Sequence, residues 1–175
     1  MKISRTLGII LLIVANIAID QISKAIVRLE VAKNEIIQII GDNFILTNVE
    51  NKGAFLGMGS DLSDTSRLIF LLILPILVLG YVVYYILKNK TLDRMSLIAF
   101  CCIVGGGIAN VYDRIIYGSV TDFFHIDLGG VFKTGIFNVA DMSVSTGMIL
   151  LLIASFVHKK KEEKEVSSNI DSATD

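Results

Sequence analysis

The chain has 175 residues, of which 53% are hydrophobic and 19% are charged, and its mean hydropathy is +0.68. Such a composition is too apolar for an ordinary soluble domain of this length, and the apolar residues fall in long blocks. The net charge of −1 provides no basic surface, so we expect no nucleic-acid partner. Together these properties favour one polytopic membrane domain.

Four apolar blocks have the length of a transmembrane helix. At about 1.5 Å per residue, the 21 residues of the first block span about 31 Å, enough to cross the hydrocarbon core of a bilayer. Pro75 lies inside the second block and predicts a local kink there. The predicted spans cover residues 7–27, 68–87, 95–112 and 136–157.

The first block could also be a secretory signal peptide, because Lys2 and Arg5 precede its apolar residues. No A-x-A cleavage site is present, however, since Ala15 and Ala18 are three residues apart. The apolar pattern also continues through Val27, so we predict a retained helix.

The polar section at residues 28–67 has the sequence features of a small β sheet. Residues 35–40 and 44–49 are rich in β-branched side chains, and Gly-Asp-Asn between them is a turn sequence. Residues 115–135 predict another short extended segment, with a turn at two adjacent glycines. We assign residues 1–158 to a single domain and predict that the polar tail, residues 159–175, is disordered.

The basic residues indicate how the chain is oriented. Three short flanks lie on one face of a four-span protein, and nine Lys and Arg residues are concentrated in them. The positive-inside rule therefore places both termini in the cytoplasm. The basic residues are Lys2, Arg5, Lys88, Lys90, Arg94, Lys159, Lys160, Lys161 and Lys164.

This orientation brings polar residues from several elements to the outer membrane edge. Ionisable groups next to hydrocarbon suggest a functional site. A transporter would more often need such groups at the bilayer midplane. The pattern favours a site at the outer interface. The residues concerned are Asp20, Asn51, Asn110, Asp113, Arg114, Asp122, Asn138 and Asp141.

Two carboxylates in this layer, Asp122 and Asp141, are candidates for the chemistry. His125 is the one histidine outside the tail region, and no HExxH or Cys/His ligand spacing supports zinc catalysis. Ser23 and Lys24 are helix neighbours that point about 100° apart, which disfavours a serine–lysine pair. Two carboxyls around one water would share a proton, so that one accepts the proton of the water while the other polarises a peptide carbonyl.

Structural interpretations of the same residues remain open at this stage. Asp122 and Asp141 could be carboxylates in the solvated headgroup region, and Asp20 and Lys24 could form a simple ion pair four residues apart. Arg114 could extend to lipid phosphates. Asn51 and Asn138 could be turn and helix-cap residues, whereas Asn110 in an apolar helix requires a hydrogen-bond partner.

The chain resembles the lipoprotein signal peptidases (signal peptidase II), which are membrane aspartyl proteases. The resemblance covers Asp20 to Gly147 and departs from the family at Ala109, where Gly is usual, and at Phe55, which follows one Ala where two are common. It is carried by five short blocks in the order of the family: Asp20-Gln21-Ile22-Ser23-Lys24; Asn51-Lys52-Gly53-Ala54-Phe55; Gly106-Gly107-Ile108-Ala109-Asn110 with Asp113-Arg114; Gly118-Ser119-Val120-Thr121-Asp122-Phe123; and Phe137-Asn138-Val139-Ala140-Asp141.

The resemblance implies roles for individual residues. Asp122 and Asp141 would form the catalytic dyad. The substrate site would be lined by Asn51, Asn110, Arg114 and Asn138. Structural support would come from Asp20, Lys24, Gly53 and Gly106.

The resemblance also implies a fold, a substrate and a location. We expect an all-α integral membrane protein with four transmembrane helices and a small extracytoplasmic β-rich platform at about residues 28–67. The implied substrate is a bacterial prolipoprotein with diacylglycerol on a cysteine, cleaved just before that cysteine. The reaction would take place at the outer face of the cytoplasmic (inner) membrane, without a metal or organic cofactor. We expect a monomer in contact with membrane lipids.

Two other functions remain alternatives. A small ion or proton transporter would use Asp20, Arg114 and Asp141 as a path. A non-catalytic lipid-binding assembly factor would have the same pocket without turnover.

Overall fold

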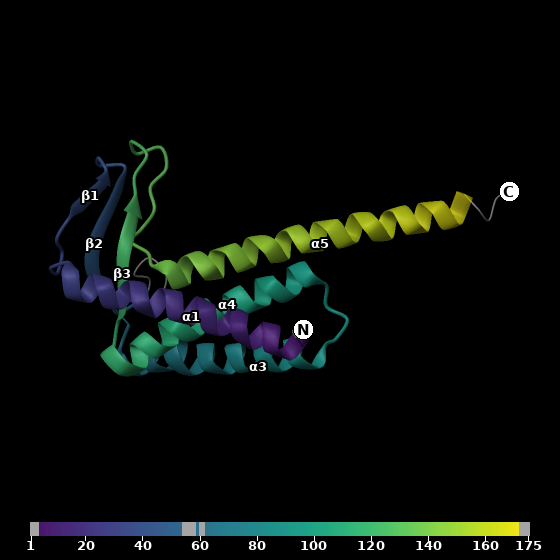
Figure 1. Ribbon diagram of the computed structural model, residues 1–175, viewed down its shortest axis with the longest axis horizontal. Coiled ribbons are helices and arrows are strands. Elements are labelled where there is room, and N and C mark those ends of the chain that lie inside the picture. Colours follow the sequence, from purple (N-terminus) through teal and green to yellow (C-terminus); the bar gives the residue numbers. More distant parts are fainter. Residues whose placement is uncertain (1–3, 54–58, 60–61, 172–175) are drawn as a thin grey trace.

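The computed structural model of the protein describes residues 4–53, 59 and 62–171, with side chains as far as residue 159. Within these residues, four helices are long and apolar enough to cross a membrane, as predicted. They are α1 (Arg5–Glu30); the continuous segment of α2 (Asp64–Arg67), η2 (Leu68–Ile73) and α3 (Leu74–Lys88); α4 (Arg94–Tyr117); and α5 (Val139–Asp171) as far as Lys159. Figure 1 shows α1, α3, α4 and the first half of α5 gathered into one bundle, with the strands at one end.

A π-helical turn lies just before Pro75, where the sequence predicts a kink. Pro75 is the second residue of α3, and η2 ends directly before the first residue of α3. Proline has no N–H to donate into the helix, and its ring crowds the preceding turn. A wider turn on the N-terminal side of the proline accommodates both effects.

Three strands form an antiparallel sheet in the order β1-β2-β3. β1 (Ile37–Ile40) and β2 (Phe44–Asn51) form the predicted hairpin, and β3 (Val120–Ile126) comes from the predicted extended segment at 115–135. Gly118, with φ 72°, caps the C-terminus of α4 in the left-handed conformation and turns the chain into β3. The third membrane helix is therefore joined to the strand that carries Asp122 by a short turn.

The helices begin and end up to five residues away from the predicted span boundaries. The fourth helix begins at Val139 rather than 136, because Phe137 pairs with Phe124 of β3 in an isolated bridge. The third helix continues past the predicted end at Tyr112 to Tyr117, so the polar residues Asp113 and Arg114 are part of the helix.

Residues 159 to 171, predicted to be disordered, continue α5 as helix. After residue 147 the chain contains no Gly or Pro, and the Lys and Glu residues that follow the span favour helix. The division of the chain at 158 stays a prediction.

Glycines allow α4 to pack closely against its neighbours. A Cβ on Gly106 would collide with the carbonyl oxygen of Ala140 in α5, and a Cβ on Gly147 would lie 2.6 Å from the carbonyl oxygen of Ala99 in α4. Small residues of this kind let membrane helices approach to backbone contact. α4 and α5, which carry Asn110 and Asp141, are consequently in direct contact.

Candidate active site

A reciprocal cap at the start of α5 fixes Asp141. The Asn138 side-chain oxygen accepts a hydrogen bond from the Asp141 backbone N–H at 2.9 Å, and Asp141 Oδ2 accepts one from the Asn138 backbone N–H at 3.2 Å. This is the capping-box arrangement, in which the cap residue and the third helical residue satisfy each other's N–H groups. The carboxyl of Asp141 is therefore held in the first turn of the helix.

Asn138 also contacts the second candidate carboxyl. Its side-chain amide donates to Asp122 Oδ1 at 2.6 Å, while the Asn51 amide donates to Asp122 Oδ2 at 2.8 Å. Asp122 is 3% exposed and Asn138 is fully buried. One asparagine thus binds both carboxyls, which the chain supplies from β3 and α5.

The surroundings of Asp122 change its acidity. Burial raises the pKa of Asp122 to about 6; the charge of Asp141 also raises it, while the amides of Asn51 and Asn138 lower it. A carboxyl that titrates close to neutral pH can both hold and release a proton under physiological conditions. Such a group is suited to acid–base chemistry.

Asn110 connects Asp141 to the helix bundle. Its amide donates to Asp141 Oδ1 at 2.9 Å, and its oxygen accepts from Lys24 Nζ at 2.8 Å and from the Asn138 amide at 3.3 Å. The side chain of Asn110 therefore makes three hydrogen bonds, which satisfies the need of an asparagine in an apolar helix for partners. α1, α4 and α5 meet at this side chain.

A buried ion cluster lies next to Asn110. Lys24 Nζ is 2.7 Å from Asp20 Oδ2 and 2.7 Å from Asp113 Oδ2, and all three side chains are fully buried. Asp20 Oδ1 also accepts from the backbone N–H of Ala140 at 2.8 Å. The Asp20–Lys24 ion pair, one of the alternatives that the sequence left open, is present, and Asp113 is a third member of the cluster.

Arg114 and Gly53 hold the turn that follows β2. Arg114 Nη2 donates to the Gly53 carbonyl at 2.9 Å and Nη1 donates to the Asn110 carbonyl at 3.1 Å. The Gly53 N–H in turn donates to the Asn51 side-chain oxygen at 2.8 Å. The turn thereby orients the amide that binds Asp122.

The site residues predicted from the sequence therefore lie together, and a family model described as signal peptidase (SPase) II matches residues 12–157. The chain belongs to the signal peptidase II family. It is 31% identical to a lipoprotein signal peptidase of Clostridium acetobutylicum, over 89% of this chain and 97% of that protein. It is 35% identical to one of Borreliella burgdorferi, over 91% of this chain and 96% of that protein.

Two solved structures have the same fold as this signal peptidase II. Both are described as bacterial membrane enzymes whose structures were determined by the in meso method. One has a TM-score of 0.77 and 28% identity, covering 88% of this chain and 90% of that chain. The other has a TM-score of 0.73 and 27% identity, covering 84% and 91%. The family assignment does not favour the transporter or assembly-factor alternatives.

The departure from the family pattern at Ala109 is accommodated in this signal peptidase II. Ala109 is fully buried, and its neighbour Asn110 keeps all three of its side-chain hydrogen bonds. The departure at Phe55 lies outside the described residues, as does Ala54.

Other nucleophiles and metal ligands do not form a second centre in the described part of the chain. His125 Nδ1 lies 3.3 Å from the Gly135 carbonyl, and Ser143 donates to the Cys102 carbonyl at 3.0 Å. Among the described residues, no group of three or more His, Cys, Asp or Glu side chains is placed to bind a metal.

Proposed function

We propose that this signal peptidase II removes signal peptides from lipid-modified prolipoproteins by aspartyl chemistry, with Asp122 and Asp141 as the catalytic pair. The observation that carries the proposal is the Asn138 side chain, which donates to Asp122 and shares a reciprocal cap with Asp141. Family membership supports the peptidase activity and a multi-pass location in the bacterial inner membrane.

In the proposed mechanism the two carboxyls share one proton. Like charges in a buried site do not both ionise easily, so the titration belongs to the pair. The ionised member takes a proton from a water molecule, and the protonated member polarises the scissile carbonyl. Breakdown of the tetrahedral intermediate returns a proton to the leaving nitrogen. These steps require no metal and no organic cofactor.

The substrate would contact the polar side chains around this pair, namely Asn51, Asn110, Arg114 and Asn138. Arg114 Nε is buried and has no hydrogen-bond partner among the described residues. A buried donor without a partner costs about 1–3 kcal/mol, which a substrate carbonyl would recover. Cleavage just before the lipidated cysteine would leave the acyl chains in the bilayer while the peptide bond meets the carboxyls.

The proposed orientation has both termini in the cytoplasm and the catalytic pair at the extracytoplasmic face. It is supported by the basic residues that flank the spans on the side opposite the sheet. We propose that the protein acts as a monomer in contact with membrane lipids, since one chain supplies both carboxyls.

Replacing either carboxyl tests the proposal. Asp122→Asn and Asp141→Asn should each lower cleavage of a lipidated precursor by about 10²–10⁴-fold, with chelator present throughout. Cleavage is followed by gel mobility, and thermal unfolding shows whether each variant is folded. Asp127→Asn, which changes a carboxylate just after β3, is the matched control and should keep wild-type activity. Wild-type cleavage by either folded dyad variant would refute the assignment.

A further inference from the structure

The ladder between β2 and β3 is interrupted beside Asp122. Leu46 pairs with Phe124 on one side of the interruption, and Val49 pairs with Asp122 on the other. Between these pairs β2 has two residues and β3 has one, which is a β-bulge. Beyond the bulge three residue pairs remain, the last of which contains Asn51. This short end of the ladder carries both Asp122 and the Asn51 amide that binds it.

The register of this short end decides whether Asn51 faces Asp122. In the observed register the Asn51 amide donates to Asp122 Oδ2 at 2.8 Å. If the strands paired without the bulge, β2 would move by one residue relative to β3. Successive residues of a strand point to opposite faces, so Glu50 rather than Asn51 would then share a face with Asp122. Contacts that stabilise the bulged register therefore also place the Asn51 amide.

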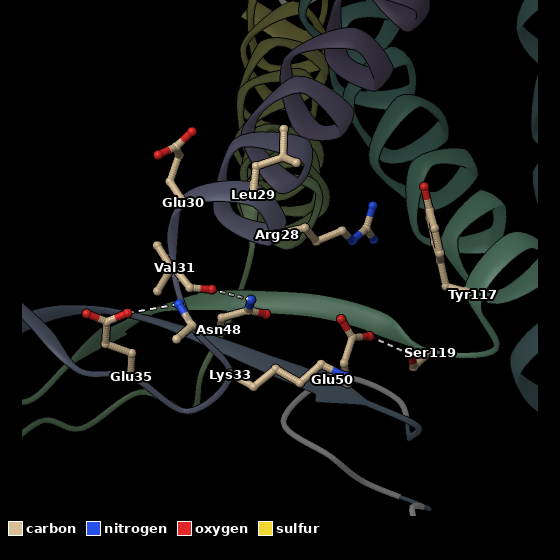
Figure 2. Close-up of a pocket in the computed structure, with 11 residues that line it drawn as sticks. Arg28, Leu29, Glu30, Val31, Lys33, Glu35, Asn48, Glu50, Tyr117 and Ser119 are labelled. Atoms are coloured by element: carbon tan, nitrogen blue, oxygen red, sulfur yellow. Dashed lines mark hydrogen bonds between the residues drawn. The ribbon is translucent and has the colours of Figure 1, made fainter.

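Such contacts lie on the opposite face of the sheet, around Thr121. The Thr121 hydroxyl donates to Glu50 Oε1 at 2.9 Å and accepts from Arg28 Nε at 2.8 Å. Ser119 donates to the other oxygen of the same carboxylate. Thr121 is fully buried, whereas Glu50 lines an open hollow between the sheet and the end of α1. Figure 2 shows Glu50 bonded to Ser119 on the sheet, below Arg28 on the helix. The Glu50 carboxylate thus ties β2 to the start of β3, beyond the bulge.

Arg28 connects this contact to the helix bundle. Its Nη2 lies 3.3 Å from Asp113 Oδ1, and its guanidinium lies 3.9 Å over the Tyr117 ring. Asp113 belongs to the buried ion cluster that reaches Asn110, the residue bonded to Asp141. The support of β3 from behind the sheet is therefore continuous with the support of Asp141.

We propose that Thr121 and Glu50 are positioning residues for the catalytic pair, because their hydrogen bond holds β2 in the register in which Asn51 reaches Asp122. In a register without the bulge, Glu50 would face the other side of the sheet and lose both hydroxyl partners. Both side chains lie on the face opposite to the Asp122 carboxyl, so they act through the strands rather than on the substrate. The inference rests on the proposed catalytic role of Asp122.

Removing the Thr121 hydroxyl without changing the shape of the side chain tests the proposal. In the full chain in detergent, Thr121→Val should lower kcat for cleavage of a lipidated precursor about tenfold, because a misplaced group near the reacting atoms slows the reaction. Thr121→Ser keeps a hydroxyl and should restore most of the activity. Thr134→Val is the matched control and should keep the wild-type kcat, since its hydroxyl bonds the backbone of Ile126 at the other end of β3.

The pH profile of kcat separates positioning from a general loss of stability. Burial raises the pKa of Asp122, and the Asn51 amide opposes that rise. The alkaline limb reports loss of the proton that the pair shares, so it should move to higher pH in Thr121→Val and stay in place in Thr134→Val. A variant that is only less stable would lose activity without moving this limb. The charged groups that also act on Asp122 are Lys24, Arg114 and Asp141.

A second variant keeps the test valid if the buried threonine does not tolerate replacement. Glu50→Gln, at the edge of the open hollow, should lower kcat and move the limb in the same direction. Thermal unfolding shows which variants are folded. An unchanged kcat or an unmoved limb in the folded variants would overturn the proposal. Full cleavage by Asp122→Asn would instead refute the catalytic assignment on which it rests.

Discussion

At the residue scale, the ionisation of Asp122 links the chemistry of the site to the stability of the fold. Its pKa rises from the ordinary value of 3.8 to about 6, chiefly through burial. The folded state therefore binds this proton more tightly than the unfolded state. The stabilisation is complete below the unfolded pKa and is lost as pH rises through about 6.

The non-titrating variant Asp122→Asn makes this loss measurable. Between about pH 4 and pH 7, the wild type should lose about 2 kcal/mol of stability relative to the variant. The measurement is thermal unfolding of both proteins in detergent across this range. For Asp127→Asn the difference should stay flat, because hydrogen bonds from Gly130 and Lys133 lower the pKa of Asp127. A flat difference for Asp122→Asn would show that burial does not raise its pKa.

The ion cluster around Lys24 shows which residue contacts the sequence could predict. Asp20 and Lys24 are four residues apart, and helix geometry alone places them together. The contact between Lys24 and Asp113 joins α1 to α4, so it depends on how the two helices pack. No rule based on spacing along the chain predicts such a contact. Asn110 and Asp122, by contrast, were predicted as site residues because they stand in motifs that resemble those of the family.

At the element scale, contact between α4 and α5 sets the distance between Asn110 and Asp141. A Cβ on Gly106 would collide with the Ala140 carbonyl oxygen and lie 2.9 Å from Val144 Cγ2. Gly106→Ala should therefore separate the two helices, at a cost of about 1–3 kcal/mol, and reduce cleavage. Thermal unfolding and cleavage of a lipidated precursor measure the two effects.

Gly80→Ala is the matched control for this change. Gly80 lies in α3, and a Cβ there would meet nothing within 4 Å. Because alanine favours helix over glycine, this variant should be as stable as the wild type or slightly more stable, with full activity. Equal behaviour of the two variants would show that the α4–α5 contact does not hold the site together.

The elements themselves were largely predictable, and their ends were not. Long apolar runs predicted all four spans, and β-branched runs around a turn predicted the β1–β2 hairpin. Hydrophobicity alone placed Ile136 and Phe137 in the fourth span. In the structure Phe137 pairs with Phe124, and Asn138 caps α5. The strand pairing that brings β3 against β2 is a long-range contact, so its register could not be predicted from local sequence patterns.

At the scale of the whole molecule, the polar side chains of the candidate site lie at one end of the helix bundle, where the sheet packs. Four separate segments supply them: α1, β2, the end of α4 with β3, and the start of α5. The short connection between α3 and α4 lies at the other end of the spans (Figure 1). The proposed topology therefore reduces to one question, which end of the bundle faces the cytoplasm.

Cysteine labelling in intact cells answers this question. Val131 is 94% exposed in the loop between β3 and α5, and Thr91 is exposed in the connection between α3 and α4. A membrane-impermeant maleimide should label Val131→Cys in intact cells, and should label Thr91→Cys only after the membrane is permeabilised. The parent chain should give little signal, because Cys101 and Cys102 lie inside α4.

The reverse labelling pattern would place the sheet and both carboxyls on the cytoplasmic side. Nine basic residues would then flank the spans on the outer side, against the positive-inside rule. The dyad geometry would be unchanged, since it depends on contacts within the chain. A precursor exported across the membrane would nevertheless present its cleavage site to the wrong end of the bundle. Labelling thus tests the proposed active-site face independently of the chemistry.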